Sequence, residues 1–231
     1  MRNDFELAGK KCHTYAVGDG GPAVFWPTMV RDTDVVDEMI KALSESEDDM
    51  VSYTLFVLEV EDWNNEMSPW HFDAGEGQVF GEGGKDTLAW IREHAIPYVE
   101  KEFPRTSEFA ITGYSLAGLF ALWSFYGSGL FQAAGCCSGS LWFEGWDKFA
   151  DGAKTPENGA VYLSLGGKEP GSGNLLTASI GVQHHKQKKR CEKDPVMRSH
   201  TYIQNSGGHF SNPVGRVAKS IVWLVEELSV Y

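Results

Sequence analysis

Ser115 lies within the pentapeptide GYSLA, residues 113–117, between a short apolar segment and a run of residues with helical spacing. The apolar segment, residues 109–111, is typical of a buried strand. A serine at a sharp turn from a strand into a helix can expose its hydroxyl as a nucleophile, and the small residues of the pentapeptide allow such a turn. Because the first N–H groups of a helix have no partners within it, the N–H of Leu116 could stabilise an oxyanion. The alternative is that Ser115 only caps the helix.

A serine hydroxyl is too weakly acidic to attack a carbonyl unaided, so it needs a histidine base and a carboxylate that orients this histidine. His209 lies in the sequence GGHF, on a glycine-flanked loop between the last expected strand and the final expected helix. We expect His209 to be the base and Glu169, which follows an expected strand directly, to be the acid. The alternatives are a structural histidine and a surface glutamate beside Lys168, and Asp194 is the second choice for the acid. Six histidines lack the position of His209: His13, His71, His94, His184, His185 and His200.

Segments with strand character alternate with segments of helical periodicity along the chain. Strands are expected at residues 22–26, 53–60, 109–111, 131–139, 160–167 and 199–205. Helices are expected at residues 34–46, 86–103 with a kink at Pro97, from Leu116 onward, 175–191 and 214–228. This alternation predicts an α/β fold with a mostly parallel central sheet, helices on both faces and ligands at the carboxyl ends of the strands. With 231 residues, 42% of them hydrophobic, and no internal repeat, the whole chain (1–231) is expected to form a single domain.

A tryptophan- and glycine-rich segment, residues 61–84, is longer than ordinary connections and is expected to be an irregular, functional loop. Aromatic side chains near strand ends could grip an apolar or aromatic acyl group, because ligand pockets are mostly lined by such side chains. The candidates for substrate binding are Trp63, Trp70, His71 and Trp142. The alternative is that these tryptophans pack the loops against the core.

A formal net charge of -12 argues against binding to nucleic acid or to an anionic membrane, since both need a positive field. The N-terminal residues lack the apolar core of a signal peptide, and no apolar run is long enough for a membrane span, so a cytoplasmic protein is expected. One basic cluster, residues 184–193, is interpreted as the solvated face of a helix, with recognition of an anionic group as the alternative. A homo-oligomer is possible.

The cysteines are expected to be reduced structural thiols, because their spacing fits neither a zinc site nor a disulfide framework. They are Cys12, Cys136, Cys137 and Cys191. No cluster of histidines and carboxylates has the spacing of a metal site such as H-E-x-x-H. Neither a metal nor an organic cofactor is therefore expected.

Four segments resemble the putative-esterase branch of the α/β-hydrolase superfamily, which includes feruloyl, siderophore and S-formylglutathione esterases. They are GYSLAGLFAL at the expected turn, SGSLWF at 138–143, GGKEP at 166–170 and GGHF at 207–210. The resemblance covers most of the chain and implies an α/β-hydrolase fold and an acyl-serine mechanism. The order Ser115, Glu169, His209 is that of α/β-hydrolases, in which the acid follows the nucleophile and the base comes last.

The chain departs from the family at the second oxyanion donor. Many such esterases have His-Gly after the corresponding strand, whereas this chain has WPTM at residues 26–29. Pro27 has no N–H to donate, so the second donor is expected to be the backbone of Thr28 or Met29, with Trp26 as a further option. Loss of one such donor typically costs about 100- to 1000-fold in rate.

These observations favour a serine hydrolase that acts on a small-molecule carboxylic ester. A thioesterase or acyltransferase with the same acyl-serine is a close alternative, and the sequence does not separate them. A noncatalytic protein that uses the same cleft for binding is a second class, because a fold alone does not establish activity.

Overall fold

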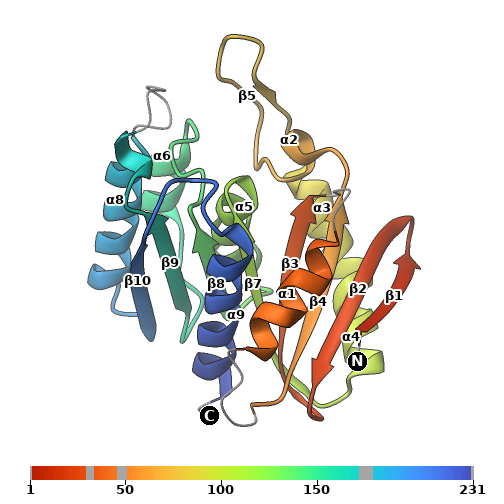
Figure 1. Cartoon of the computed structure of the whole chain (residues 1–231). Helices are drawn as coiled ribbons and strands as arrows, with labels where there is room; N and C mark the ends of the chain where they lie inside the picture. Colours follow the sequence, from red (N-terminus) through yellow and green to blue (C-terminus); the bar gives the residue numbers. More distant parts are fainter. Residues whose placement is uncertain (1, 30–33, 46–50, 172–178, 230–231) are drawn as a thin grey trace.

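An eight-stranded sheet forms the centre of the computed structural model, which describes residues 2–29, 34–45, 51–171 and 179–229 (Figure 1). The strands, in their order across the sheet, are β1 (Arg2–Leu7), β2 (Lys10–Val17), β4 (Tyr53–Val60), β3 (Gly21–Met29), β7 (Thr106–Tyr114), β8 (Ala133–Cys137), β9 (Ala160–Gly166) and β10 (Ser199–Asn205). The pairs β1–β2 and β2–β4 are antiparallel, and the remaining neighbours are parallel. The predicted mostly parallel α/β sheet is therefore confirmed.

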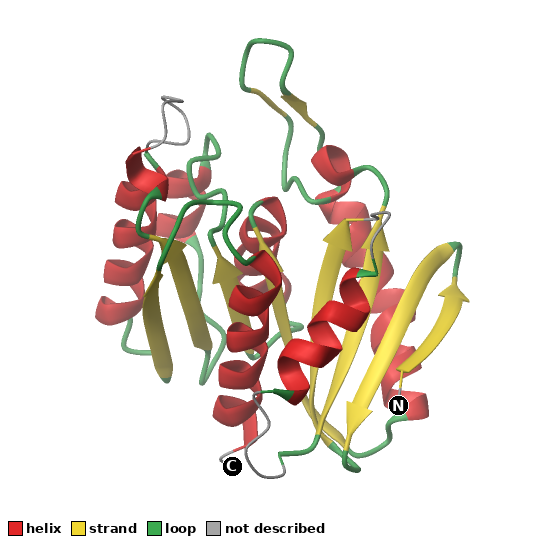
Figure 2. Ribbon diagram, viewed as in Figure 1, coloured by secondary structure: helices red, strands yellow, loops and turns green. Residues whose placement is uncertain are grey.

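Helices cover both faces of this sheet (Figure 2). On one face, α1 (Val35–Ser44) packs beside α9 (Pro213–Ser229), and α9 lies against β3 and β8. On the other face lie α5 (Leu116–Ser128) and a long helical segment made of α3 (Gly84–Trp90), a π-helical stretch (Ile91–Ala95) and α4 (Ile96–Glu102). At the β10 edge, α8 (Ile180–Lys193) packs against β9 and β10.

Two apolar clusters, one on each face, hold these layers together. The first joins β3, β4 and α5 with the helical segment around Ile91, and includes the fully buried Phe25, Phe56 and Phe120. The second joins Val24 and Leu55 of the sheet with residues of α1 and α9. Parallel strands covered on both faces need apolar side chains in both directions, which explains the unbroken apolar run at residues 55–58 of β4.

The N-terminal hairpin of β1 and β2 was not expected from the sequence. Its two strands join at Ala8 and Gly9, which both have positive φ values, 45° and 78°. Two central residues with positive φ suit a two-residue hairpin turn, but Ala-Gly lacks the asparagine or aspartate that usually marks such a turn. β1 is also an edge strand with several exposed polar side chains, so it carries little apolar signal.

The segment 61–84 is more regular than expected. It contains a short helix, α2 (Trp63–Glu66), and a small hairpin of β5 (Phe72–Asp73) and β6 (Val79–Phe80). The hairpin is held by Phe72 and Phe80, whose rings stack with centroids 5.9 Å apart. The region after β8 likewise contains a helix, α6 (Trp146–Gly152), where irregular structure was expected.

Other helices begin and end close to the predicted positions. Near Pro97, where a kink was expected, the structure has a π-helical stretch that ends at Ala95, two residues before this proline. Residue 46 of the first expected helix and residues 175–178 of the expected helix 175–191 lie outside the described residues. Within the described ranges, no helix has the length and apolar character that crossing a membrane requires.

All four cysteines are buried and free. Burial raises the pKa of Cys12 to about 12 and that of Cys191 to about 11, so these thiols are protonated at neutral pH. They pack as small apolar side chains, in agreement with the structural role expected for them.

Candidate active site

Ser115 occupies a sharp turn between β7 and α5. Its backbone has φ 58° and ψ -118°, a conformation that residues other than glycine rarely adopt. The turn is tight, because a Cβ atom on Gly113 would lie only 2.4 Å from the backbone of Ala117. The N–H of Ser115 donates to the carbonyl of Cys137 on β8 (3.0 Å), which ties the turn to the neighbouring strand. The strand, the turn and the helix are those that the sequence predicted.

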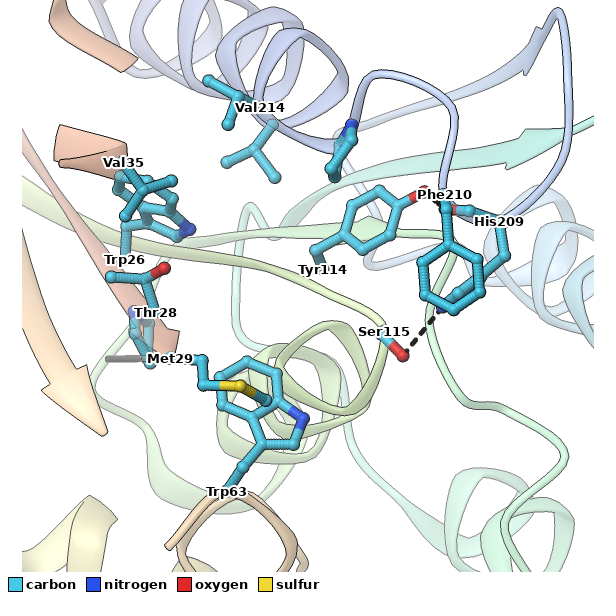
Figure 3. A pocket seen from close by; sticks show the side chains of 13 residues that line it. Trp26, Thr28, Met29, Val35, Trp63, Tyr114, Ser115, His209, Phe210 and Val214 are labelled. Atoms are coloured by element: carbon cyan, nitrogen blue, oxygen red, sulfur yellow. Dashed lines mark hydrogen bonds between the residues drawn. The ribbon is translucent and has the colours of Figure 1, made fainter. Parts of the chain in front are cut away.

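Ser115, His209 and Glu169 form a continuous chain of hydrogen bonds. The distance from Ser115 Oγ to His209 Nε2 is 3.0 Å (Figure 3), and the distance from His209 Nδ1 to Glu169 Oε2 is 2.8 Å. The three residues come from the end of β7, the short turn after β9 and the loop between β10 and α9. Parallel strands end at the same edge of a sheet, so residues remote in sequence meet there. In this arrangement Nδ1–H faces the carboxylate and Nε2 is free to accept the serine proton.

The Glu169 carboxylate is buried and held on both oxygens. Oε1 accepts hydrogen bonds from Ser138 Oγ (2.7 Å), the N–H of Gly166 (2.7 Å) and Arg216 Nη1 (2.9 Å). Burial by itself would raise the pKa of Glu169, but the hydrogen bonds from His209, Ser138 and Gly166 outweigh it and lower the pKa to about 2. Glu169 is therefore ionised at neutral pH and can orient the imidazole.

Arg216 links the acid to the loop that carries His209. This buried side chain donates through Nη2 to the carbonyls of Ser206 and Gly208, both at 2.9 Å. Through Nη1 it also donates to the hydroxyl of Tyr114 (2.9 Å), which in turn donates to the carbonyl of His209 (2.5 Å). The sequence analysis did not identify Arg216. A signal exists, because this arginine lies on the helix face that carries the apolar residues of α9.

A cavity of about 410 Å³ opens beside Ser115 and His209 (Figure 3). It is lined by Trp26, Pro27, Thr28, Met29, Val35, Trp63, Tyr114, Ser115, His209, Phe210, Pro213, Val214 and Val217. Besides Ser115 and His209, three residues with predicted roles are in this lining: Thr28, Met29 and Trp63. Leu116 is the first residue of α5, so its N–H has no partner within the helix. Its position directly after Ser115 fits the expected oxyanion donor.

Trp70, His71 and Trp142 do not line this cavity. Trp70 donates from Nε1 to the carbonyl of Glu144 (2.7 Å) and packs against neighbouring phenylalanines. Trp142 packs against the rings of the β5–β6 hairpin. The hydrophobic effect accounts for both positions, because these rings bury the loops against the core. His71 is exposed on the segment between α2 and β5.

The hydrogen bonds of His209 to Ser115 and Glu169 involve neither Asp194, the second choice for the acid, nor the basic cluster. Asp194 follows α8, where its carboxylate contacts Thr155 Oγ1 and the N–H of Val196. In the basic cluster, Lys186 and Arg190 form ion pairs with Asp147, so this face of α8 is partly neutralised. Among the described residues, no group of three or more histidine, cysteine or carboxylate side chains has a geometry that could hold a metal ion.

A comparison with known protein families finds one that matches most of the chain. Residues 7–209 match the model of the family described as “Putative esterase”. No curated protein sequence matches the chain.

Solved structures are similar in fold. The siderophore hydrolase EstB from Aspergillus nidulans is 15% identical, with a TM-score of 0.75, over 100% of this chain and 96% of that one. The siderophore hydrolase EstA from the same organism is 15% identical, with a TM-score of 0.71, over 97% of this chain and 94% of that one. An IroE-like serine hydrolase from Shewanella oneidensis is 13% identical, with a TM-score of 0.72, over 96% of this chain and 78% of that one.

Proposed function

The chain belongs to the “Putative esterase” family and is a carboxylic-ester hydrolase, and we propose that it cleaves small esters through an acyl-serine intermediate on Ser115. The observation that carries this mechanism is the chain of hydrogen bonds from Ser115 Oγ through His209 to Glu169, at 3.0 and 2.8 Å. A nucleophile, a base within reach of its proton and a carboxylate that orients the base are the parts that acyl transfer requires.

In the first half of the reaction, His209 Nε2 takes the hydroxyl proton while Ser115 Oγ attacks the ester carbonyl. The resulting oxyanion is stabilised by the N–H of Leu116 and by a second donor from Thr28 or Met29, which line the same cavity as Ser115. His209 then gives its proton to the departing alcohol oxygen, which leaves the acyl group on the serine. In the second half, a water molecule attacks the acyl-serine with the same proton transfers, and the carboxylic acid departs.

A fluorophosphonate probe with mass-spectrometric mapping tests the mechanism directly. We expect labelling at Ser115, no labelling of Ser115→Ala and strongly reduced labelling of His209→Ala. Ser140→Ala is a matched control, because Ser140 Oγ lies 3.5 Å from Ser115 Oγ yet has no role in the proposed reaction. This variant should retain labelling at Ser115. A folded protein that resists the probe and does not hydrolyse short-chain nitrophenyl esters would contradict the proposal and favour a noncatalytic binding protein.

The role of Glu169 has its own test. Glu169→Gln keeps the size of the side chain but lets the amide favour the wrong tautomer of His209. We expect kcat to fall by on the order of 10,000-fold, as for replacement of the acid by its amide in a serine protease. A fall in kcat of less than about tenfold would exclude Glu169 as the acid that orients His209.

An acyltransferase would use the same acyl-serine with an alcohol in place of water. Product analysis in the presence and absence of added alcohols separates the two reactions. Dominant release of the free acid in both conditions is expected of a hydrolase, whereas accumulation of the transesterified product would favour the acyltransferase. Parallel assays with thioesters of the same acyl groups test the thioesterase alternative.

A further inference from the structure

Phe210 is a large apolar side chain at the edge of the active site, and 92% of it is exposed. The next most exposed large apolar residue among those described, Val182, is 61% exposed and lies on α8 outside the cavity. The Phe210 ring contacts the imidazole of His209 edge to face, with centroids 5.2 Å apart and an interplanar angle of 86°. It also lines the cavity that contains Ser115 (Figure 3). One face of the ring therefore remains open to a ligand beside the base.

The proposed reaction determines which part of an ester reaches this ring. The departing alcohol oxygen must receive its proton from His209 Nε2, so the alcohol portion lies on the His209 side of the scissile bond. Phe210 is adjacent to His209 on that side. The acyl portion extends the other way, into the part of the cavity lined by Trp26, Val35 and Val214 (Figure 3).

The cavity has the chemical character of an apolar site. None of the described residues that line it is an aspartate, glutamate, lysine or arginine. Its volume of about 410 Å³ lies within the range of about 300–1,000 Å³ that is usual for small-molecule pockets. A charged acyl group would lose its hydration there without gaining an ionic partner from the described lining, whereas an apolar chain would be transferred favourably from water.

We propose that Phe210 is a specificity-determining residue that binds an apolar alcohol group, while the adjoining cavity binds an uncharged apolar acyl group. The preferred substrate is then an uncharged ester that is apolar on both sides of the scissile bond. This inference rests on the proposed function of the same site. It adds the class of substrate and assigns each side of the ester to its own set of residues.

The alcohol side is tested with benzyl butyrate and methyl butyrate. Their alcohols have similar acidities, so the ratio of the two kcat/KM values reports binding of the benzyl ring. In Phe210→Ala we expect this ratio to fall by about 2- to 12-fold, the range for loss of one aromatic pair. Phe210→Tyr should restore the ratio, and Val182→Ala should leave it unchanged.

The ratio separates specificity from a disturbance of His209, because damage to the base lowers kcat/KM for both esters by the same factor. An unchanged ratio in Phe210→Ala, whether or not both rates fall, would overturn the role of Phe210. The same variant should keep its preference among acyl chains, since these bind in the other part of the cavity.

The acyl side is tested with methyl acetate, methyl butyrate, methyl hexanoate and the monomethyl ester of adipic acid. We expect kcat/KM to rise about fourfold for each methylene that enters the cavity. The adipate half-ester, which places a carboxylate at the end of a similar chain, should be a much poorer substrate than hexanoate. Val214→Phe narrows the cavity and should reduce hexanoate hydrolysis more than acetate hydrolysis, without a change in the benzyl-to-methyl ratio. A flat acyl series, or equal rates for adipate and hexanoate, would overturn the apolar acyl site.

The fluorophosphonate experiment distinguishes failure of this inference from failure of the proposed function. Labelling at Ser115 with no apolar preference on either side leaves the mechanism intact and rejects the substrate class. A folded protein with no labelling and no hydrolysis of any of these esters rejects both.

Discussion

The guanidinium of Arg216 contacts the oxygen of Glu169 that faces away from His209. Arg216 Nη1 lies 2.9 Å from Oε1, whereas His209 Nδ1 lies 2.8 Å from Oε2. Because both carboxylate oxygens are engaged, the carboxylate cannot rotate without breaking a charge-assisted hydrogen bond. Arg216 also binds two carbonyls of the loop that carries His209. One side chain therefore fixes both the acid and the approach of the base.

Arg216→Met should lower both stability and activity. Removal of one partner leaves the Glu169 charge buried without its ion pair, which typically costs about 3–5 kcal/mol in the free energy of unfolding. The Glu169 carboxylate would also lose the contact that fixes Oε1, so kcat should fall because the imidazole of His209 is held less firmly. Urea unfolding and kcat at neutral pH measure the two effects.

Arg216→Lys is the matched control for the charge. It keeps a cation near Glu169 but cannot reproduce the planar, five-donor geometry that reaches Ser206, Gly208 and Tyr114. The loss of stability should then be smaller than in Arg216→Met, while kcat still falls. A purely structural arginine would instead give lower stability with an unchanged kcat of the folded protein in both variants.

The backbone of Ser115 gives a prediction about stability. Its φ of 58° and ψ of -118° form a conformation that glycine tolerates and alanine does not. Such strain costs about 1–3 kcal/mol. A glycine relieves most of it, but the more flexible unfolded chain then loses more conformational entropy on folding. Ser115→Gly should therefore be more stable than Ser115→Ala by about 1 kcal/mol in urea unfolding, although both are inactive.

Ser124, within the regular helix α5, provides the opposite control. There glycine is unfavourable, and Ser124→Gly should be less stable than Ser124→Ala by about 1 kcal/mol. If Ser115→Gly were less stable than Ser115→Ala, as is expected for the same pair at position 124, the strained geometry of the turn would not contribute to stability.

Much of the architecture follows from local sequence signals. β4 and β10 coincide with the predicted ranges because each is a short β-rich segment bounded by turn residues. Ser115 was identified from a strand, a turn and a helix that are contiguous in the chain, and His209 and Glu169 from their places after strands. Each of these signals lies within about ten residues of the residue that it identifies, as hydrophobic periodicity does.

The features that were missed depend on contacts between distant segments. Arg216 is separated from Glu169 by 47 positions in the sequence, and only the assembled sheet shows that it reaches this carboxylate. Trp70 and Trp142, like Trp63, are tryptophans in segments that were expected to be loops, but their neighbours in the folded structure differ. Trp63 lines the cavity, whereas the other two pack against phenylalanines. Loop tryptophans cannot be divided into ligand-binding and packing residues by sequence position alone.

Alanine substitutions at these tryptophans should separate the two roles. Trp142→Ala removes a ring that packs against Phe72 and Phe80, and it should lower the free energy of unfolding by about 3 kcal/mol, at the low end for aromatic truncation in a core. In the absence of denaturant, kcat/KM of Trp142→Ala should stay close to that of the wild type. Trp63→Ala removes part of the wall of the cavity, so it should change KM for methyl hexanoate and lower the free energy of unfolding less than Trp142→Ala does. If Trp142→Ala instead changed KM and left stability unaltered, Trp142 would be a substrate-binding residue.

Acidification should destabilise the protein in two successive ranges of pH. Burial, the dominant effect, lowers the pKa of His184 to about 4, although its hydrogen bond to the carbonyl of Gly139 acts in the opposite direction. An unfolded histidine has a pKa of about 6.5, so between about pH 6.5 and 4 the unfolded chain binds a proton that the folded protein does not. Stability should therefore fall as the pH is lowered through this window.

Glu169 acts in the lower window. Its pKa is about 2 in the folded protein, against 4.5 for the ordinary side chain, so the unfolded state again binds the proton first. The contribution of the ionised carboxylate is complete above about pH 4.5 and is lost as the pH falls toward 2. Urea unfolding at a series of pH values should show both slopes. His184→Gln should flatten the upper slope and Glu169→Gln the lower one, and an unchanged upper slope in His184→Gln would assign that window to other groups.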